Sequence, residues 1–470
     1  MNHRQQPAAY NSRATKRKRH PNAEQTDDNG INNNDNAERR QRLSVSNYKT
    51  LRPDPNSDLP LSIRFRPIRC SSSPSSSRRH NHRSNRTISE GSRKWVFSSR
   101  NFSNYEDKVL VVSYNILGVE NTLKHPDLYL EVPPKFLEWD WRKKLICKEI
   151  NQYSASIICF QEVDRFDDLG DLLQKDGFKG VYKARTGEAY DGCAIFWKDK
   201  LFTLLHQENI EFKSFGLRDN VAQLCVFKMN LDQSQPDLCT HIPETIPNQS
   251  RILLVGNIHV LFNPNRGDIK LGQVRLFLER AYNLSQEWGS IPVIMTGDLN
   301  SIPQSAMYQF LASSKLDVQL HDRRKISGQI QHPSQCRHFS SQARNAASIS
   351  MSISRPLRYR WSDEELTLAT GSGEITHLQH QLNLSSAYIG VPGNALTRDS
   401  NGEPLVTSYH SKFLGTVDYI WHTEELVPIR VLETLPVNIL RSAGLPSKRW
   451  GSDHLALVCE LAFSDDGNKT

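Results

Sequence analysis

The sequence predicts an α/β sandwich, because short apolar runs typical of buried strands alternate with longer segments whose apolar residues follow helical spacing. The first strand-like run is 109–114, and helical spacing is clearest in 139–153 and 270–287. Many strands with interspersed helices are typical of sheets that pack against helices. The sequence shows no repeat of fixed period, so a solenoid is not expected.

Order is expected from about Lys108 onward. Strands are predicted at 109–114, 155–161, 194–197, 221–227, 252–258, 292–297, 415–421 and 454–461. Helices are predicted at 139–153, at 270–287, from near Ser305, and at 363–369. Between 321 and 376 the pattern weakens into Ser-, Gln- and Arg-rich sequence, which we interpret as an insertion or a mobile loop.

The first 100 residues have the composition of a disordered basic tail. They are rich in Asn, Ser, Arg and Pro, with runs of Asn at 32–34 and of Ser around Pro74. The basic cluster 16–19 would suit nuclear import or phosphate contact, and ordinary solvated charge is the alternative interpretation.

The net charge of +8 belongs to this tail. Residues 1–100 hold 21 Lys and Arg against 8 Asp and Glu, a surplus of 13, so the remaining residues carry a net charge of about −5. A slightly acidic domain cannot hold nucleic acid by bulk electrostatics alone. Contact with RNA would therefore need a local groove, a metal ion or the tail.

Composition also excludes several classes of protein. The chain has no run of about eighteen apolar residues that could span a bilayer, and its N-terminus lacks the apolar stretch of a secretory signal. An intracellular protein that does not bind a membrane is expected. The eight cysteines are scattered without a Cys-x-x-Cys pair. A zinc ribbon or finger is therefore not predicted, and a metal site would rest on oxygen ligands.

Polar residues stand at or near one end of six predicted strands. Each alone has a simple explanation as a turn former or cap, but their recurrence indicates a shared site. These residues are Asn115, Glu162, His259, Asp298 with Asn300, Asp418, and Asp453 with His454.

The residue types suit hydrolysis of a phosphodiester. Mg²⁺ prefers oxygen ligands, and Glu162, Asn115 and Asp453 could supply them. Asp298 would orient and deprotonate the attacking water, or share a second metal ion. His259 and His454 would donate hydrogen bonds to the phosphoryl oxygens. The carboxylate of Asp418 would hold one of the two imidazoles in its charged form.

Several segments of the chain resemble the exonuclease-endonuclease-phosphatase superfamily, and within it the carbon catabolite repressor protein 4 type deadenylases with their Angel and nocturnin branches. The resemblance covers about 107–463 and implies a two-sheet, four-layer α/β sandwich with helices outside. The matching segments are 113–117, 160–163, 191–196, 257–259, 296–301, 417–420 and 452–454.

The resemblance implies roles for individual residues. Implied catalytic residues are Glu162, Asp298, His259, His454 and Asp418. Implied metal ligands are Glu162, Asn115, Asp298, Asn300 and Asp453, for one or two Mg²⁺ ions, with Mn²⁺ as an alternative. Implied substrate contacts are His259, Pro264, Asn300 and Phe413, the last as a base-stacking ring.

Two departures from the deadenylase pattern concern the substrate. Ser408 stands five residues before Phe413, where the family's deadenylases have Asn, which removes an amide that would favour adenine. The leucine-rich repeat that carries assembly into a deadenylase complex is absent from the front of the chain. The segment 262–270 looks closer to the Angel branch, whose members include RNA-end phosphatases.

The leading hypothesis is a Mg²⁺-dependent 3′-to-5′ exoribonuclease that shortens the poly(A) tails of mRNA and releases AMP, in the nucleus and the cytoplasm. Its partners would be single-stranded RNA and deadenylase subunits that bind without the repeat. A second hypothesis uses the same metal site on a cyclic phosphate at an RNA end or on a small nucleotide. A catalytically inactive RNA-binding protein and a lipid phosphodiesterase are the remaining alternatives.

Overall fold

The computed structural model describes residues 92–99, 105, 107–230, 251–329 and 361–464, which all belong to one compact unit, 84–470. The predicted tail up to residue 91 and most of the predicted insertion, 330–360, lie outside the described residues.

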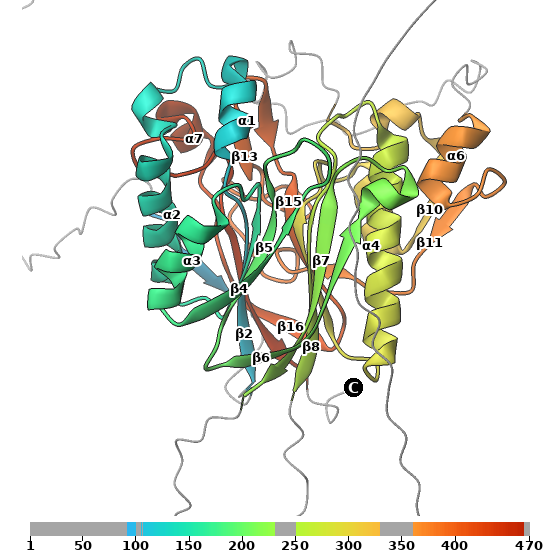
Figure 1. Ribbon diagram of the computed structural model, residues 1–470, viewed down its shortest axis with the longest axis horizontal. Helices are drawn as coiled ribbons and strands as arrows, with labels where there is room; N and C mark the ends of the chain where they lie inside the picture. The colour runs from blue at the N-terminus through green and yellow to red at the C-terminus, as the bar shows by residue number, and fades with distance from the viewer. Residues whose placement is uncertain (1–91, 100–104, 106, 231–250, 330–360, 465–470) are drawn as a thin grey trace, which may run out of the picture. The chain divides into compact units, whose positions relative to one another are not determined.

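Two mixed sheets form the centre of the unit (Figure 1). The seven-stranded sheet has the order β1 (Trp95–Phe97), β16 (Leu426–Leu432), β17 (Leu457–Phe463), β2 (Lys108–Asn115), β3 (Ile157–Gln161), β5 (Gly192–Lys198) and β4 (Phe178–Ala184). The six-stranded sheet has the order β12 (Ser385–Ser386), β15 (Asp418–His422), β9 (Val293–Asp298), β8 (Ile252–His259), β7 (Val221–Met229) and β6 (Phe202–Glu211). In each sheet one central pair is parallel, β2 with β3 and β8 with β9.

The apolar alternation of the central strands produces the layers. In β2, Val109 and Val111 join the core between the two sheets, whereas Leu110 and Val112 join the core under α2 (Trp139–Tyr153) and α3 (Phe166–Lys175). Successive side chains of a strand point to opposite faces, so a run that is apolar throughout is buried on both sides.

The other sheet is covered on its outer face by α4 (Gly267–Glu287), α5 (Ala306–Ser313) and α6 (Asp363–Thr370), which share a third apolar core with it. Figure 1 shows α2 and α3 on one side of the sheets and α4 and α6 on the other. The predicted four-layer sandwich is therefore confirmed.

Shorter elements connect these layers. Two small hairpins are β10 (Lys315–Asp317) with β11 (His377–Gln379), and β13 (Ser408–His410) with β14 (Phe413–Gly415). The remaining helical turns are α1 (Val119–Lys124), α7 (Val437–Ala443), η1 (Pro126–Leu128), η2 (Pro134–Phe136), η3 (Phe212–Phe215), η4 (Val318–Leu320) and η5 (Arg323–Lys325). Among the described residues no helix has the length and apolar character needed to cross a membrane.

Most predicted elements are confirmed within a few residues, and two predictions need correction. The strand predicted at 415–421 is two strands, because β14 ends at Gly415 and β15 starts at Asp418 in a different sheet. The predicted start of the domain is too late, since Trp95–Phe97 pairs with β16. Beside β1, the buried Arg93 side chain donates to the carbonyl of Ala456 at 2.6 Å and pairs with Glu149 at 3.2 Å.

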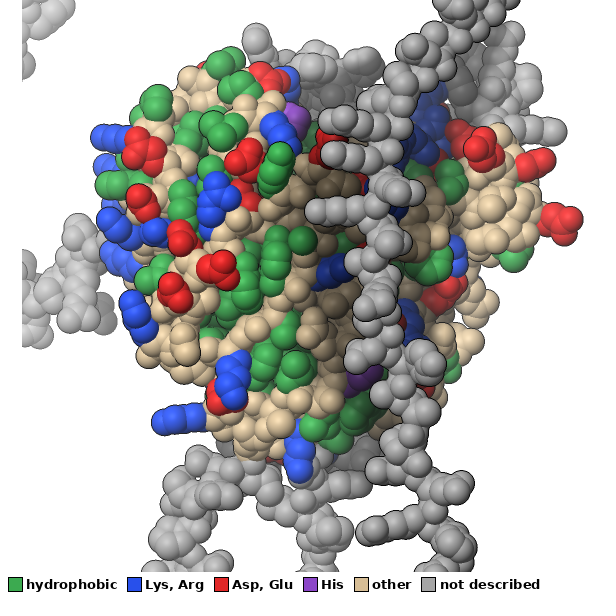
Figure 2. Space-filling view, in the orientation of Figure 1, with side chains coloured by type: hydrophobic (Ala, Val, Ile, Leu, Met, Phe, Trp, Pro, Cys, Tyr) green, Lys and Arg blue, Asp and Glu red, His purple; other side chains and the backbone are tan. Residues whose placement is uncertain are grey.

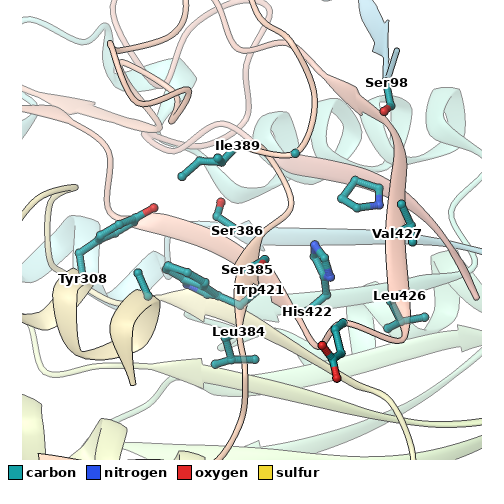
Figure 3. Close-up of a pocket in the computed structure, with 14 residues that line it drawn as sticks. Ser98, Tyr308, Leu384, Ser385, Ser386, Ile389, Trp421, His422, Leu426 and Val427 are labelled. Atoms are coloured by element: carbon teal, nitrogen blue, oxygen red, sulfur yellow. The ribbon is translucent and has the colours of Figure 1, made fainter. Parts of the chain in front are cut away.

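Two large cavities lie at opposite ends of β15. The first, of about 500 Å³, surrounds the residues predicted for catalysis at the Asp418 end. The second, of about 420 Å³, lies at the end that carries Trp421 and His422, with Tyr308 and Ile389 around it (Figure 3). None of the residues predicted for catalysis or binding lines the second cavity.

Candidate active site

The two sheets bring the predicted residues to one edge of the sandwich. In the six-stranded sheet, Asp298 pairs with His259 on one side and with Asp418 on the other, so the three residues form a row across β8, β9 and β15. In the seven-stranded sheet, Asn115 ends β2, and Glu162 follows the parallel neighbour β3. The polar ends of these five strands therefore converge.

Gly297 lets Asp298 reach this position. Its φ of 151° lies in a region that favours glycine, and an added Cβ would lie 2.0 Å from the carbonyl oxygen of Ile258 on β8. The glycine before the aspartate thus permits the close approach of β8 and β9 at the site.

Most of the predicted residues line the first cavity. The lining ones are Glu162, His259, Pro264, Asp298, Asn300, Phe413, Asp453 and His454. Asn115 and Asp418 are buried behind this lining, with 0% and 1% exposure, and each is hydrogen-bonded to a lining residue. The structure therefore brings all ten together, while their roles stay predictions.

Glu162 is held as an ionised carboxylate. Its backbone has a φ of 57°, and its oxygens accept hydrogen bonds from Asn121 Nδ2 at 2.7 Å, Asn115 Nδ2 at 3.0 Å and Gly118 N at 3.0 Å. Burial alone would raise the pKa of Glu162, but His259 and these hydrogen bonds lower it to about 2. We assign the effect mainly to the hydrogen bonds, because burial lowers the pKa of His259 to about 4 and leaves that ring neutral at pH 7.

Asn115 lies between the two carboxylates with its amide nitrogen facing them. Its Nδ2 donates to Glu162 Oε1 at 3.0 Å and to Asp298 Oδ2 at 3.1 Å, whereas its Oδ1 accepts from Leu117 N at 3.0 Å. In this orientation Asn115 organises the carboxylates. To act as an oxygen ligand, as predicted, Asn115 would have to rotate its side-chain amide so that Oδ1 faces the carboxylates.

Asp298 and Asp418 form a buried acidic pair. Burial first, and then the negative charge of Asp418, raise the pKa of Asp298 to about 7. Asp298 Oδ1 accepts from Asn300 N at 2.8 Å, while Asp418 Oδ1 has no partner among the described residues. Two buried carboxylates with an unsatisfied oxygen indicate a place for positive charge.

Asp418 also holds His454 in a charged state. His454 Nδ1 lies 2.8 Å from Asp418 Oδ2, and Nε2 lies 3.9 Å from Asp298 Oδ2. Burial would lower the pKa of His454, but the charges of Asp418 and Asp453 raise it well above its usual value. A protonated imidazole is a hydrogen-bond donor and a poor metal ligand.

His259 and Asn300 form a second pair of polar side chains. Asn300 Nδ2 lies 3.2 Å from His259 Nε2 and donates to Val260 O at 3.0 Å. Asn300 has a φ of 44°, and Lys270 Nζ donates to its carbonyl oxygen at 2.6 Å. The buried lysine therefore helps to hold Asn300 in a backbone conformation that asparagine tolerates better than most residues.

The other half of the cavity is formed near the β13–β14 hairpin. Tyr129 OH donates to Asp453 Oδ2 at 2.9 Å. Phe413 is packed over Gly415, where a Cβ would lie 2.9 Å from its ring, and its centroid is 5.9 Å from that of His410. Ser408, at the position that departs from the deadenylase pattern, also lines the cavity.

The sequence-based prediction omits several polar residues of the site, including Tyr129, Asn121 and Arg185. Asn121 donates to Glu162 from α1, a helix that was not predicted. Arg185 lines the cavity and pairs with Asp191 at 3.2 Å, where burial raises the pKa of the carboxyl to about 6. Asp191 lies in the segment 191–196, which carries part of the resemblance, and its carboxylate is the feature of the sequence that indicates a nearby cation.

Charge on the visible face is mixed. Figure 2 shows acidic and basic side chains interspersed on the α2 and α3 side of the unit. Recognition of an anionic substrate therefore rests on the local groups of the cavity, such as His454, Arg185 and Lys412, more than on this face.

The donor set fits a divalent cation. One group of possible ligand atoms, all within 4.8 Å of one another, comes from Asp298, Asp418 and His454. The carboxylate of Glu162 is joined to that of Asp298 through the amide of Asn115, which donates a hydrogen bond to each. Because His454 is charged, the oxygen donors Glu162 and Asp298 suit a cation better than its ring does, and Asp453 lines the same cavity. The identity of the ion stays a prediction.

Comparisons with known proteins agree with this geometry. The chain is 57% identical over 454 residues to "Carbon catabolite repressor protein 4 homolog 5" of Arabidopsis thaliana, covering 96% of each chain. It is 47% identical to homolog 3 of the same organism, covering 81% of each. The crystal structure of ANGEL2, a 2′,3′-cyclic phosphatase, in complex with adenosine-2′,3′-vanadate matches with a TM-score of 0.60 and 31% identity, over 79% of this chain and 99% of that one.

A family model extends across the domain. The model of the endonuclease/exonuclease/phosphatase family matches residues 112–454, from β2 to the second site histidine. Members of this family hydrolyse phosphodiesters or phosphate esters and are typically dependent on a divalent metal ion. With a family match over most of its length, the chain belongs to the endonuclease/exonuclease/phosphatase family.

Proposed function

We propose that the chain is a metal-dependent 3′-to-5′ exoribonuclease that shortens poly(A) tails and releases AMP. The observation that carries the proposal is the buried cluster of Glu162, Asp298 and the Asp418–His454 pair, which opens into a cavity of about 500 Å³ next to the ring of Phe413. The 57% identity to a carbon catabolite repressor protein 4 homolog supports RNA as the substrate class.

Each residue of the cluster has a defined part in this reaction. A divalent cation held by Glu162 and Asp298 would polarise the phosphoryl oxygens and lower the pKa of a water molecule. Asp298, whose Oδ2 lies 3.1 Å from Asn115 Nδ2 and 3.9 Å from His454 Nε2, is suited to orient that water and accept its proton. His454, charged by Asp418, donates Nε2–H toward the negative charge that develops on phosphorus-bound oxygen.

The organic part of the substrate is held outside this cluster. Phe413 offers an aromatic face that any base can stack on, and Pro264 and His259 line the same cavity. Ser408 offers a hydroxyl in place of an amide. We therefore expect preference for adenine to be moderate.

The test is incubation of the purified chain with 5′-labelled oligo(A) and Mg²⁺, followed by denaturing electrophoresis. A ladder of shortened products with release of AMP is expected, and Glu162→Gln should abolish it. Glu403→Gln is a matched control, because Glu403 is another buried carboxylate but lies beside the second cavity. Absence of a ladder, or a ladder that survives Glu162→Gln, contradicts the proposal.

A second candidate function is hydrolysis of a 2′,3′-cyclic phosphate at an RNA end. It is favoured by the likeness to ANGEL2, whose structure contains adenosine-2′,3′-vanadate. The same assay with an oligonucleotide that ends in a cyclic phosphate distinguishes the two functions. Opening or removal of the cyclic phosphate without shortening of the chain favours the second candidate.

For the cell, we propose that the protein works in both the nucleus and the cytoplasm on single-stranded mRNA tails. The basic cluster 16–19, which lies outside the described residues, would direct nuclear entry. Imaging of a fluorescent fusion, with and without replacement of these four residues by alanine, tests this. A nuclear fraction that does not change on replacement would contradict the assignment to this cluster.

A further inference from the structure

Phe262 is a large apolar side chain of the active-site cavity to which no role has been assigned. It lines the cavity beside His259 and Pro264, and 54% of its surface is exposed to solvent. Other rings, such as Phe97 and Phe215, are exposed to a similar extent, so what distinguishes Phe262 is its place in the lining of this cavity. An aromatic face at that place suggests a partner that is not part of the protein.

The loop that carries Phe262 is firmly held. Before it, Leu261 N donates to Oε1 of the buried Gln273 at 2.9 Å, and Val260 N donates to Asp298 O at 2.9 Å. After it, Asn265 N donates to Asn263 Oδ1 at 2.9 Å. These bonds hold the backbone on both sides of Phe262, so the loop between β8 and α4 keeps this residue at the edge of the cavity.

Phe262 and Phe413 belong to elements that lie on different sides of Asp298 in the strand order. The six-stranded sheet has the order β15, β9, β8, and Asp298 ends the middle strand. Phe413 belongs to the hairpin that precedes β15, whereas Phe262 belongs to the loop that follows β8. By strand order, one aromatic residue of the cavity lining therefore belongs to each side of Asp298.

A phosphodiester in a nucleic acid also has one nucleoside on each flank. We propose that Phe262 is a second base-stacking platform, which holds the nucleoside on the side of the scissile phosphate away from Phe413. The inference rests on the proposed action on RNA. Because stacking uses the face of the base and no hydrogen bond to its edge, this position should accept all four bases.

The test compares Phe262→Ala with Phe262→Trp and with Phe215→Ala. Phe215 is a matched control, since it is 55% exposed and lies beside a different cavity. Phe262→Ala should raise KM for oligo(A) roughly tenfold, the size expected for loss of one base–aromatic stack, with little change in kcat. Phe262→Trp should retain the wild-type KM, and Phe215→Ala should change neither constant.

Substrates with one base separate stacking from a general effect on the site. Adenosine 2′,3′-cyclic phosphate has a single nucleoside, which can occupy only one of the two flanks, so either Phe262→Ala or Phe413→Ala, but not both, should raise its KM. An equal rise in KM for this substrate in both variants would assign Phe262 to the shape of the site and overturn the proposal. An unchanged KM for oligo(A) would also overturn it.

A binding measurement makes the inference independent of turnover. Oligo(A) with 2-aminopurine at either of its last two positions is titrated with protein in EDTA, and quenching of the fluorescence reports stacking. Phe262→Ala should relieve quenching at one position and Phe413→Ala at the other. If both variants relieve quenching at the same position, or if neither variant relieves it, the proposal is contradicted. If the wild-type protein binds oligo(A) and quenches the 2-aminopurine fluorescence but does not shorten oligo(A), the proposed function is contradicted, whereas the stacking role of Phe262 is still supported.

Discussion

The two cavities at the ends of β15 are similar in size and differ in their buried charges. At the Asp418 end, carboxylates face one another and an imidazolium, and Asp418 Oδ1 lacks a partner among the described residues. At the other end, the buried Glu403 accepts a hydrogen bond from Tyr308 OH at 2.7 Å and another from the side chain of Ser386. His422, beside them, has its Nδ1 2.9 Å from the carbonyl oxygen of Thr423.

Volume therefore does not distinguish the two cavities, whereas their buried charge does. In the second cavity the buried acid and the histidine are satisfied by neutral partners, which is the usual condition of buried polar groups. In the first, negative charges are concentrated beyond what the protein itself neutralises. A site that is electrostatically incomplete without a cation or substrate is the one suited to catalysis.

The largest expected effect that tests this comparison comes from Glu162→Gln. The substitution keeps the shape of the side chain and removes the charge that would bind the cation. The hydrolytic rate should fall by about a thousandfold or more, since metal-assisted charge stabilisation contributes several kcal/mol. Single-turnover kinetics on oligo(A) measures the loss. The equivalent change in the second cavity, Glu403→Gln, should retain more than about half of the activity, as Gln can accept the same hydrogen bond.

Asp418→Asn should have the next largest effect. An amide cannot hold His454 in its charged form, so the pKa of His454 should fall toward its ordinary value of about 6.5. Activity should drop by about a hundredfold at pH 8 and recover in part toward pH 6, where the ring is protonated again. The ring protons of His454, followed by NMR, report its pKa directly. An activity profile parallel to that of the wild type would show that the charge of His454 is not used.

Addition of Mg²⁺ should stabilise the folded protein by a smaller amount. A cation that binds only the folded state at about a hundred times its Kd adds about 2.7 kcal/mol, which raises Tm by a few °C in a domain of this size. Differential scanning fluorimetry after removal of metal with EDTA measures the shift. Glu403→Gln should show the same rise as the wild type, whereas Glu162→Gln should lose most of it. A rise that persists in Glu162→Gln would place the cation elsewhere.

The central strands and the polar residues at their ends could be predicted from the sequence, because both follow from strong local patterns. Val109–Val112 is apolar on both faces, and polar residues such as Glu162 follow such runs directly. Peripheral strands were missed for physical reasons. Pro428 lies inside β16, where proline argues against a strand, and the register shifts there between Pro428 and Arg430. Strand β6 lies at the edge of its sheet and contains many polar residues, so it lacks a clear alternation of apolar and polar side chains.

The site itself was predicted as a list of residues, without the contacts that assign their roles. Pairing of Asp298 with Asp418 depends on strand register, which no local pattern encodes. The orientation of Asn115 and the contribution of Asn121 depend on how α1 packs near Glu162. Arg93 was assigned to the tail because its neighbours are basic and polar, although its side chain is buried against Glu149.

The smallest effect on activity, and a clear effect on stability, is expected for the acid of the second cavity. Burial raises the pKa of Glu403 to about 7, against about 4.5 in the unfolded chain. Above pH 4.5 the unfolded state gains stability by releasing this proton, whereas the folded state keeps it until about pH 7. Glu403 therefore makes the protein less stable as pH rises from about 4.5 to 7, by on the order of a few kcal/mol. Urea unfolding at pH 5 and at pH 8 measures the free energy of unfolding, which should fall more between these two pH values in the wild type than in Glu403→Gln. Equal losses would mean that Glu403 is ionised when folded, and the second cavity would then share the uncompensated charge that distinguishes the first.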